Sequence, residues 1–332
     1  MSVILPCYNS GRYIRDCLES LRRQTFTDFE VLAVDDGSID NTAGILEEAA
    51  GKDGRFFFFR REKRGVVSAA NYAIRKSRGE YIARMDSDDI CSPFRLERQV
   101  DFLDCNPKTG AVGSLAEFGG DPEKGAGFAH YVQWANSIVS AEDIDRDRFV
   151  ELPVPNPTLM FRACVFAEHG MFRQGDFPED YEFFLRLLDR GVRVEKIAQR
   201  LLVWNDPQDR LSRVDPRYHP RAFFRIKSLY LERWLRLNAP GYPKVGILGA
   251  GKSVEKKLSP LLDLGIRPVY HFDVSRKRLS GSGSRIRPAV DLPPPGELFM
   301  LSYVGSRRAR NKLLEFMRGR GYRRGRDYLL VS

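Results

Sequence analysis

The sequence has little cysteine and histidine, and the few that it has are poorly placed for chemistry. Its five cysteines form an odd set without a CxxC pair, and its four histidines lack the spacing of metal ligands. We therefore expect neither a disulfide framework nor a zinc site. No apolar run is long enough to span a membrane, and the opening "MSVILPCYNS" has no basic segment before its short apolar run. This predicts a cytoplasmic protein.

The composition is that of a globular protein large enough for two domains, with 332 residues, 42% hydrophobic and 30% charged. The net charge of +10 is uneven, because residues 303–332 hold nine Lys/Arg and two Asp/Glu. Such a basic tail is compatible with binding to the inner face of a membrane or to nucleic acid. It is also compatible with a solvated helix face that binds no partner. No nucleic-acid motif accompanies it. We expect no nucleic-acid partner and favour the solvated face.

Apolar strands alternate with amphipathic helices at the start of the chain. The expected strands cover residues 2–6, 29–38, 55–61 and 80–85, the third of them fully buried, and the expected helices cover 11–24, 39–51 and 66–79. This alternation predicts an α/β protein with a mostly parallel sheet and helices on both faces. Ligands bind beyond the carboxyl ends of such strands, where the polar clusters "PCYNS", "DDGS" and "DSDD" fall.

The middle of the chain is harder to assign. Residues 95–155 predict a helix over 95–106 and a Gly-rich segment, and we expect a second substrate to be recognised in this region. A helix over 177–191 begins with two acids. The amphipathic helix over 221–237, with Pro220 in its first turn, fits either a membrane surface or packing inside the protein.

The last segment starts a second strand, Gly-rich turn and helix over residues 244–265, followed by a strand over 267–273 and a "SGSGSR" loop over 280–285. This predicts a small Rossmann-like domain. Its GxGxxG pattern is imperfect, because Val254 stands at the third glycine, although Asp273 is placed where a ribose-binding acid would stand. Binding of a nucleotide, docking of a partner and formation of a homodimer all stay open for this domain.

These patterns predict three parts of the chain. A catalytic domain is expected over residues 1–215, a helix and linker over 216–243, and the Rossmann-like domain over 244–332.

The segments "SVILPCYNSGRYIRDCLESLRRQTFTDFEVLAVDDGSIDNT" and "RGVVSAANYAIRKSRGEYIARMDSDD" closely resemble glycosyltransferase family 2, whose members have the GT-A fold. The resemblance covers residues 2 to about 110, and more weakly to about 215. It implies transfer of a sugar from a nucleoside diphosphate sugar, expected to be UDP-linked, with inversion and with Mn²⁺ or Mg²⁺. A glycan or lipid-linked acceptor and a role in surface glycan or glycolipid synthesis are also implied.

Asp86 and Asp88 match the family's DxD motif. Neighbouring carboxylates repel unless a cation lies between them, and a divalent cation also stabilises the charge of a departing diphosphate. The resemblance implies that Asp88 contacts the metal and that Asp86 faces the metal or the ribose. Asp89 either joins them or caps a turn. The whole cluster also fits helix capping ahead of Ser92 and Pro93.

The same resemblance implies a set of donor-binding residues: Pro6, Tyr8, Asn9, Asp35, Asp36, Arg64, Gly65, Asn71, Asp86, Arg210 and Ser212. In this set Tyr8 stacks on the base, Asp36 accepts hydrogen bonds from the base or ribose, and Arg210 and Ser212 contact phosphate. Pro, Asn, Asp and Gly also suit ordinary strand-to-helix turns. Arg64 and Asn71 equally fit a surface charge and an internal cap.

Inversion needs a general base that removes the proton of the acceptor hydroxyl. Asp180 in "PEDYEF" matches the family's ED signature and is the predicted base, with Glu179 beside it; helix capping is the alternative. The absence of QxxRW indicates transfer of single sugars, and no histidine stands where many members place one. A catalytically inactive nucleotide-binding or scaffold protein, with a basic C-terminal interaction domain, stays open as the rival function.

Overall fold

The computed structural model describes residues 1–273 and 286–332, so the predicted loop over 280–285 lies outside the described residues. The chain forms two compact units. The first contains Met1–Ile144 and Pro153–Asp215, and the second contains Asp145–Leu152 and Pro216–Ser332. Among the described residues, no helix combines the length and the apolar character needed to cross a membrane.

The first unit is built on one sheet of eight strands in the order β3-β2-β1-β4-β7-β6-β8-β5. Its strands are β1 (Ser2–Cys7), β2 (Glu30–Asp35), β3 (Phe56–Arg60), β4 (Tyr81–Arg84), β5 (Ile90–Cys91), β6 (Thr109–Phe118), β7 (Met160–Arg162) and β8 (Arg193–Trp204). The four neighbours β3, β2, β1 and β4 run parallel to one another, and β6 runs parallel to β8. β7 pairs antiparallel with β4 and β6, and β5 pairs antiparallel with β8. The predicted mostly parallel α/β sheet is confirmed.

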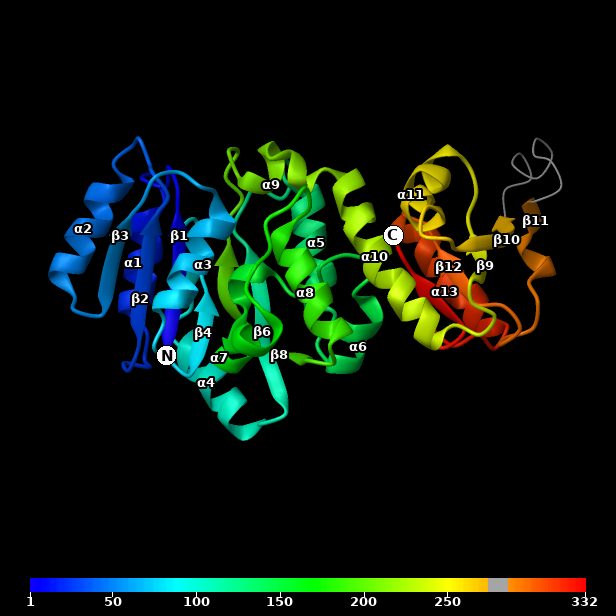
Figure 1. Cartoon of the computed structure of the whole chain (residues 1–332), viewed down its shortest axis with the longest axis horizontal. Coiled ribbons are helices and arrows are strands. Elements are labelled where there is room, and N and C mark those ends of the chain that lie inside the picture. Colours follow the sequence, from blue (N-terminus) through cyan, green and yellow to red (C-terminus); the bar gives the residue numbers. More distant parts are fainter. Residues whose placement is uncertain (274–285) are drawn as a thin grey trace. The chain divides into compact units, whose positions relative to one another are not determined.

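Helices cover both faces of this sheet (Figure 1). They are α1 (Ile14–Arg22), α2 (Thr42–Lys52), α3 (Val66–Lys76), α4 (Arg95–Cys105), α5 (Ala126–Asn136), α6 (Ala141–Asp147), α7 (Ala163–His169), α8 (Glu179–Asp189) and α9 (Leu211–Val214), with a 3-10 turn at Asn156–Thr158. The apolar sides of α1, α2 and α4 pack with alternate residues of β1 and β4, such as Val3, Leu5 and Ala83. Because strand side chains alternate between faces, the opposite face is left for α3, which packs on β1 and β2.

The prediction that residues 55–61 form a fully buried strand is wrong. β3 lies at the edge of the sheet and pairs only with β2. Phe56 is buried, but Phe57, Phe58 and Phe59 are only half-buried. An edge strand has one neighbour and partial cover, so an apolar run need not lie in the centre of the sheet.

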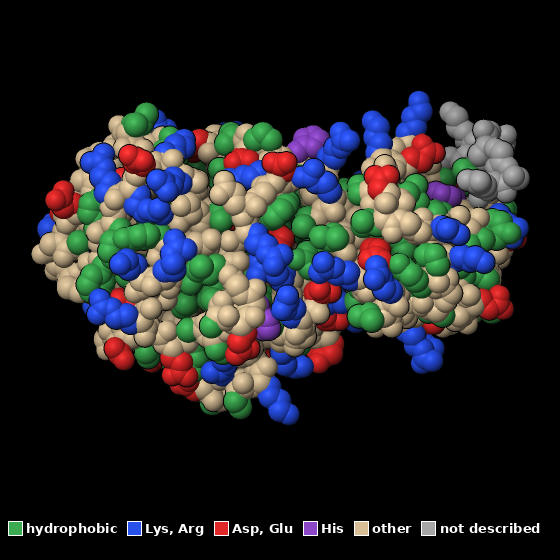
Figure 2. Space-filling view, in the orientation of Figure 1, with side chains coloured by type: hydrophobic (Ala, Val, Ile, Leu, Met, Phe, Trp, Pro, Cys, Tyr) green, Lys and Arg blue, Asp and Glu red, His purple; other side chains and the backbone are tan. Residues whose placement is uncertain are grey.

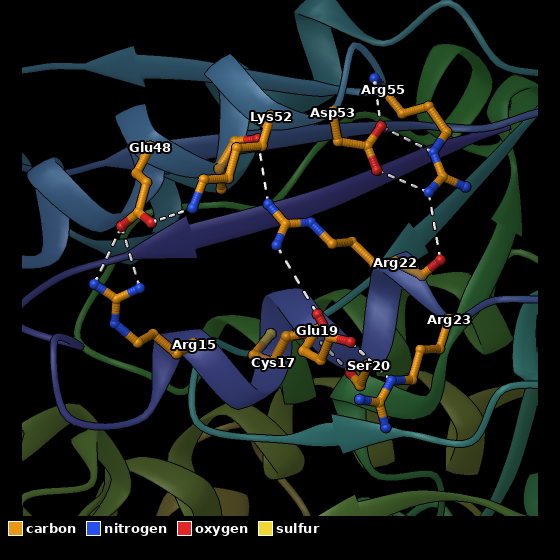
Figure 3. Close-up of polar contacts among 11 residues, drawn as sticks. Arg15, Cys17, Glu19, Ser20, Arg22, Arg23, Glu48, Lys52, Asp53 and Arg55 are labelled. Atoms are coloured by element: carbon orange, nitrogen blue, oxygen red, sulfur yellow. Dashed lines mark hydrogen bonds and ion pairs between the residues drawn. The ribbon is translucent and has the colours of Figure 1, made fainter.

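Ion pairs tie α1, α2 and the turn after α2 together at the surface (Figure 3). Glu48 binds Arg15 of α1 at 3.2 Å and Lys52, one turn further along α2, at 2.6 Å. Arg55 and Asp53 pair at 2.8 Å. The two pairs of Glu48 are exposed and contribute little to stability, since water screens them, whereas the Arg55–Asp53 pair is partly buried.

The second unit has a five-stranded parallel sheet in the order β11-β10-β9-β12-β13. Its elements are α10 (Pro220–Asn238), β9 (Lys244–Leu248), α11 (Lys252–Leu262), β10 (Arg267–Asp273), β11 (Ile286–Pro288), β12 (Met300–Ser302), α13 (Arg307–Gly319) and β13 (Tyr328–Leu330), with 3-10 turns at Pro216–Tyr218 and Ala289–Asp291. In chain order this is 3-2-1-4-5, as in the first five strands of a doubly wound sheet.

The helix α10 packs inside the second unit. Its Ile226, Tyr230, Leu231 and Leu235 are buried there, and Trp234 lies against two other aromatic rings of the unit, Phe149 at 6.5 Å and Phe299 at 5.5 Å. This packing accounts for the amphipathic pattern without a membrane. On the visible face, Lys and Arg side chains are spread over both units, and Asp and Glu side chains are interspersed among these basic side chains (Figure 2).

A buried arginine of α8 fixes this helix to the segment before it. Arg186 and Glu182 meet at 3.0 Å with side chains that are 3% and 2% exposed. Arg186 also donates to the backbone carbonyls of His169, Gly170 and Met171. The position of α8, which begins with the predicted catalytic acids, therefore depends on one guanidinium.

We expect Arg186→Met to lower the free energy of unfolding by about 3 kcal/mol, because it leaves a buried carboxylate without its main partner. Arg15→Met is the control, because it breaks an exposed pair on the same unit and should have a much smaller effect. Urea unfolding of the full chain measures both changes. Equal losses for the two variants would contradict the expectation.

Candidate active site

Three neighbouring strands bring their carboxyl ends to one edge of the first sheet (Figure 1). β1 lies between β2 and β4, and all three are parallel. Cys7 at the end of β1 pairs in register with Asp35 at the end of β2. The amide of Met85, just after β4, donates to the Ile4 carbonyl of β1. The segments that follow therefore emerge side by side, and they carry the three polar clusters.

Hydrogen bonds join these segments to one another. The Ser10 and Ser87 hydroxyl oxygens are 2.7 Å apart. The Asn9 amide donates to the Ser38 hydroxyl at 2.9 Å, and the Asn9 side-chain oxygen accepts from the Ile39 amide at 3.0 Å. Asn9 has φ of 49°, a left-handed conformation that asparagine tolerates. In this structure Asn9 therefore performs the turn chemistry that was weighed against a role in base binding.

Tyr8 is the exposed member of the predicted base pocket. Its residue surface is 40% exposed, and the Lys63 ammonium lies 3.8 Å from its ring centroid. The Asp36 carboxylate accepts the amides of Arg64 at 3.0 Å and Gly65 at 2.6 Å, and so fixes the loop that carries Lys63. Gly65 has φ of 88°, which residues with a side chain rarely adopt.

Other predicted donor residues support this edge from within. Pro6 is buried in β1. Asp35 is also buried, and its Oδ1 accepts the Ser38 amide at 3.1 Å. Asn71 bonds through both ends of its side-chain amide with the backbone of Phe172, at 2.8 and 3.1 Å. This pair of bonds ties α3 to the segment that leads into α8.

The acids after β4 are held in three different ways. Asp86 pairs through Oδ1 with Nη2 of Arg84 at 2.6 Å. Asp88 is partly buried, and burial followed by the charge of Asp86 raises its pKa to about 6. Asp89 is buried and accepts the amide of Asn205 at 2.9 Å, which anchors it to the end of β8. Asp86 and Asp88 thus stay partly exposed, while the buried Asp89 supports the turn.

Helix capping does not explain the acidic cluster. The N-cap of α4 is Phe94, and no side chain caps it. Among the described residues, no group of three or more His, Cys, Asp or Glu side chains could hold a metal on its own. Two hard carboxylates nevertheless suit Mg²⁺ or Mn²⁺ when diphosphate oxygens and water supply the other ligands. Asp86 and Asp88 fit a divalent cation of that kind.

Asp180 lies at the start of α8 and remains partly exposed. Its Oδ1 accepts the Tyr181 amide at 2.7 Å. Surrounding protein atoms, and then the charge of Glu179, raise the pKa of Asp180 to about 7, with a further contribution from Asp86 that Arg84 opposes. Asp180 is therefore close enough to Asp86, one of the acids after β4, for that charge to affect its pKa.

The segment after β8 lies along the same acids. Asn205 donates from its side chain to the Asp88 carbonyl at 2.7 Å and accepts from Arg210 on its own carbonyl at 3.2 Å. The Arg210 guanidinium lies 3.5 Å from the Trp204 ring centroid. The Ser212 hydroxyl is buried and has no hydrogen-bond partner in the described part of the chain. This segment therefore offers a cation near the acidic cluster and, two residues further along the chain, a buried hydroxyl.

Sequence reasoning missed three residues of this site: Lys63, Arg84 and Asn205. A signal was present for Arg84, which is the charged residue of an otherwise apolar strand, Tyr81–Arg84. Lys63 stands next to a residue that was singled out, and Asn205 is the polar residue that follows β8. Strand ends and interrupted apolar runs could have identified all three.

Known proteins are similar in sequence to this part of the chain. Residues 2–166 match the family described as glycosyl transferase family 2. An uncharacterized glycosyltransferase of Haemophilus influenzae is 33% identical over 190 residues, which is 55% of this chain and 58% of that protein. The chondroitin synthase of Escherichia coli is 43% identical over 101 residues, which is 30% of this chain and 15% of the synthase. The chain thus spans less than two thirds of these curated relatives.

Solved structures share the fold. Residues 1–349 of TarS from S. aureus, in complex with UDP-GlcNAc, have a TM-score of 0.57 at 22% identity, over 79% of this chain and 71% of theirs. The mannosyltransferase PcManGT from Pyrobaculum calidifontis, in complex with GDP-Man and Mn²⁺, has a TM-score of 0.52 at 18% identity, over 80% and 68%. These likenesses confirm the predicted GT-A fold. Since the matched residues carry the three strand ends and their polar clusters, the domain that contains residues 2–166 belongs to glycosyl transferase family 2.

Proposed function

We propose that the chain transfers a sugar from a nucleoside diphosphate sugar, with UDP as the expected nucleotide, to an acceptor hydroxyl with inversion. Assistance by a divalent metal and a role in surface glycan or glycolipid synthesis belong to the same proposal. The observation that carries it is the gathering of Tyr8, Asp36, Asp86, Asp88 and Asp180 around one sheet edge.

The nucleoside would bind between β1 and the loop fixed by Asp36. Tyr8 presents an exposed ring on which a base can stack. Lys63 beside that ring would donate to the base or to a phosphate oxygen. Because Asp36 and Gly65 set the backbone of this loop, they would shape the pocket rather than only contact the ligand.

The diphosphate would lie over the acids after β4. Asp86 and Asp88 would hold Mn²⁺ or Mg²⁺, which when bound would supply Lewis-acid stabilisation of the charge on the leaving diphosphate. The positive charge of Arg210 acts on Asp88, and the Ser212 hydroxyl lacks a hydrogen-bond partner among the described residues. Both could therefore donate to phosphate oxygens.

Asp180 would act as the general base with Glu179 beside it. Its partial exposure leaves it accessible to an acceptor hydroxyl. Its raised pKa makes it a better proton acceptor than an ordinary carboxylate while it is still largely ionised above neutral pH. The N-cap of α8 is Pro178, while Asp180 Oδ1 accepts the Tyr181 amide in the first turn of the helix.

The relatives support this proposal. The curated relatives are glycosyltransferases, and one of them is a chondroitin synthase. One structural neighbour is in complex with UDP-GlcNAc, which supports a UDP-linked donor, and another is in complex with Mn²⁺, which supports a divalent cation.

A panel of nucleotide sugars, screened by thermal shift, tests donor and metal binding together. We expect at least one UDP-sugar to raise the melting temperature only when Mn²⁺ or Mg²⁺ is present, and Asp88→Asn to abolish this shift by removing a metal ligand. Asp101→Asn, an exposed aspartate on α4, is the matched control and should behave as wild type. A shift that survives in Asp88→Asn, or that needs no metal, would contradict the metal assignment.

Turnover should depend on the ionised form of Asp180. We expect kcat to fall about tenfold per pH unit below about pH 7, because protonation removes the base. Asp180→Asn should lower kcat by at least about 100-fold and keep metal-dependent donor binding. Asp189→Asn, at the exposed other end of α8, is the control.

NMR of the product would report the anomeric configuration. Full turnover by Asp180→Asn would show that the base is another group. Donor binding by wild type without any sugar transfer would instead favour the rival reading, an inactive nucleotide-binding protein.

A further inference from the structure

Arg84 is a buried arginine at the end of a core strand. It is the last residue of β4, and its side chain is 6% exposed. Its neighbours Ala83 and Met85 point into the apolar cluster with α1 and α4. Because strand side chains alternate, Arg84 points to the opposite face of the sheet, where Asp86 also lies.

The guanidinium of Arg84 sits among acids of the candidate site. Its Nη2 lies 2.6 Å from Oδ1 of Asp86. Its positive charge also opposes the effect of burial on Asp88 and on Asp180, so it lies within electrostatic reach of both. Three acids from two segments thus share one buried cation. A carboxylate with this contact is already neutralised before any ligand arrives.

Arg84 is held by fewer bonds than it could make. Its Nε and Nη1 are buried and have no hydrogen-bond partner among the residues that the structure describes. Buried guanidinium donors without partners are costly, so a purely structural arginine is normally bonded at most of its donors, as Arg186 is. Within residues 1–273 and 286–332, Asp86 is the one side chain paired with Arg84, so Arg84 can shift when Asp86 changes partner.

We propose that Arg84 is a resident counter-cation which occupies Asp86 in the ligand-free protein and makes metal binding depend on the donor's diphosphate. This inference rests on the proposed function. With Arg84 in place, Asp86 and Asp88 together attract a divalent ion weakly, because a fixed positive charge opposes it. A diphosphate brings negative charge and further oxygen ligands, which restore the attraction. Arg84 is thus a positioning residue that acts through Asp86.

Titration of Mn²⁺, with the free ion followed by electron paramagnetic resonance, tests this on the full chain. We expect wild type to bind Mn²⁺ at least about tenfold more tightly with UDP, or GDP, than without a nucleotide. Arg84→Met should bind Mn²⁺ about tenfold more tightly than wild type when no nucleotide is present. Coulomb's law gives about this factor for a unit charge beside a divalent ion, even at the dielectric constant of water.

Two matched variants separate charge at this position from other effects. Arg84→Lys keeps the positive charge and should stay near wild type in Mn²⁺ affinity. Arg15→Met removes one positive charge from α1, where it pairs with Glu48 away from the acidic cluster, and should leave Mn²⁺ affinity unchanged. A residue that only supported the fold would weaken Mn²⁺ binding when replaced, whereas the counter-cation predicts tighter binding.

Two results would overturn the inference: nucleotide-free Mn²⁺ affinity in Arg84→Met no higher than in wild type, or equal Mn²⁺ affinity in wild type with and without nucleotide. The second result needs no variant, so it decides the matter even if Arg84→Met does not fold. The proposed function fails differently, by the absence of any metal-dependent binding of UDP or GDP to wild type.

Discussion

Repulsion between the acids after β4 is the constraint on which the rest of the first unit depends. Asp86, Asp88 and Asp89 fall within four consecutive positions, and each needs a group that offsets its negative charge. These come from Arg84 on the strand itself, from Arg210 beyond β8 and from the Asn205 amide. The acids at this edge of the sheet are therefore stabilised by segments that lie far apart in the sequence.

Local pattern was enough to predict most of the fold. The strands β1, β2 and β4 and the helices between them follow from alternation of apolar residues, which is written within each segment. The place of β3 could not be predicted in this way. A run of phenylalanines looks the same in the centre of a sheet as at its edge, because only pairing with distant strands distinguishes the two.

The candidate site was predictable where it lies at strand ends. Parallel strands deliver their carboxyl ends to one edge, so the clusters around Tyr8, Asp36 and Asp86 could be expected to meet. Contacts made across long separations could not be expected. Asn205 reaches the Asp88 carbonyl across 117 positions, and Lys63 reaches the Tyr8 ring only because the loop before α3 folds back.

The second unit incorporates eight residues from the middle of the chain, 145–152. There Phe149 is buried, the Lys227 ammonium donates to the Val150 carbonyl, and Arg324 pairs with Asp147. Residues 216–332 consequently cannot be separated as a complete unit by a single cut, since a cut after residue 215 would expose residues 145–152 to solvent. During synthesis on the ribosome, residues 145–152 can complete their packing only after the C-terminal residues have been made.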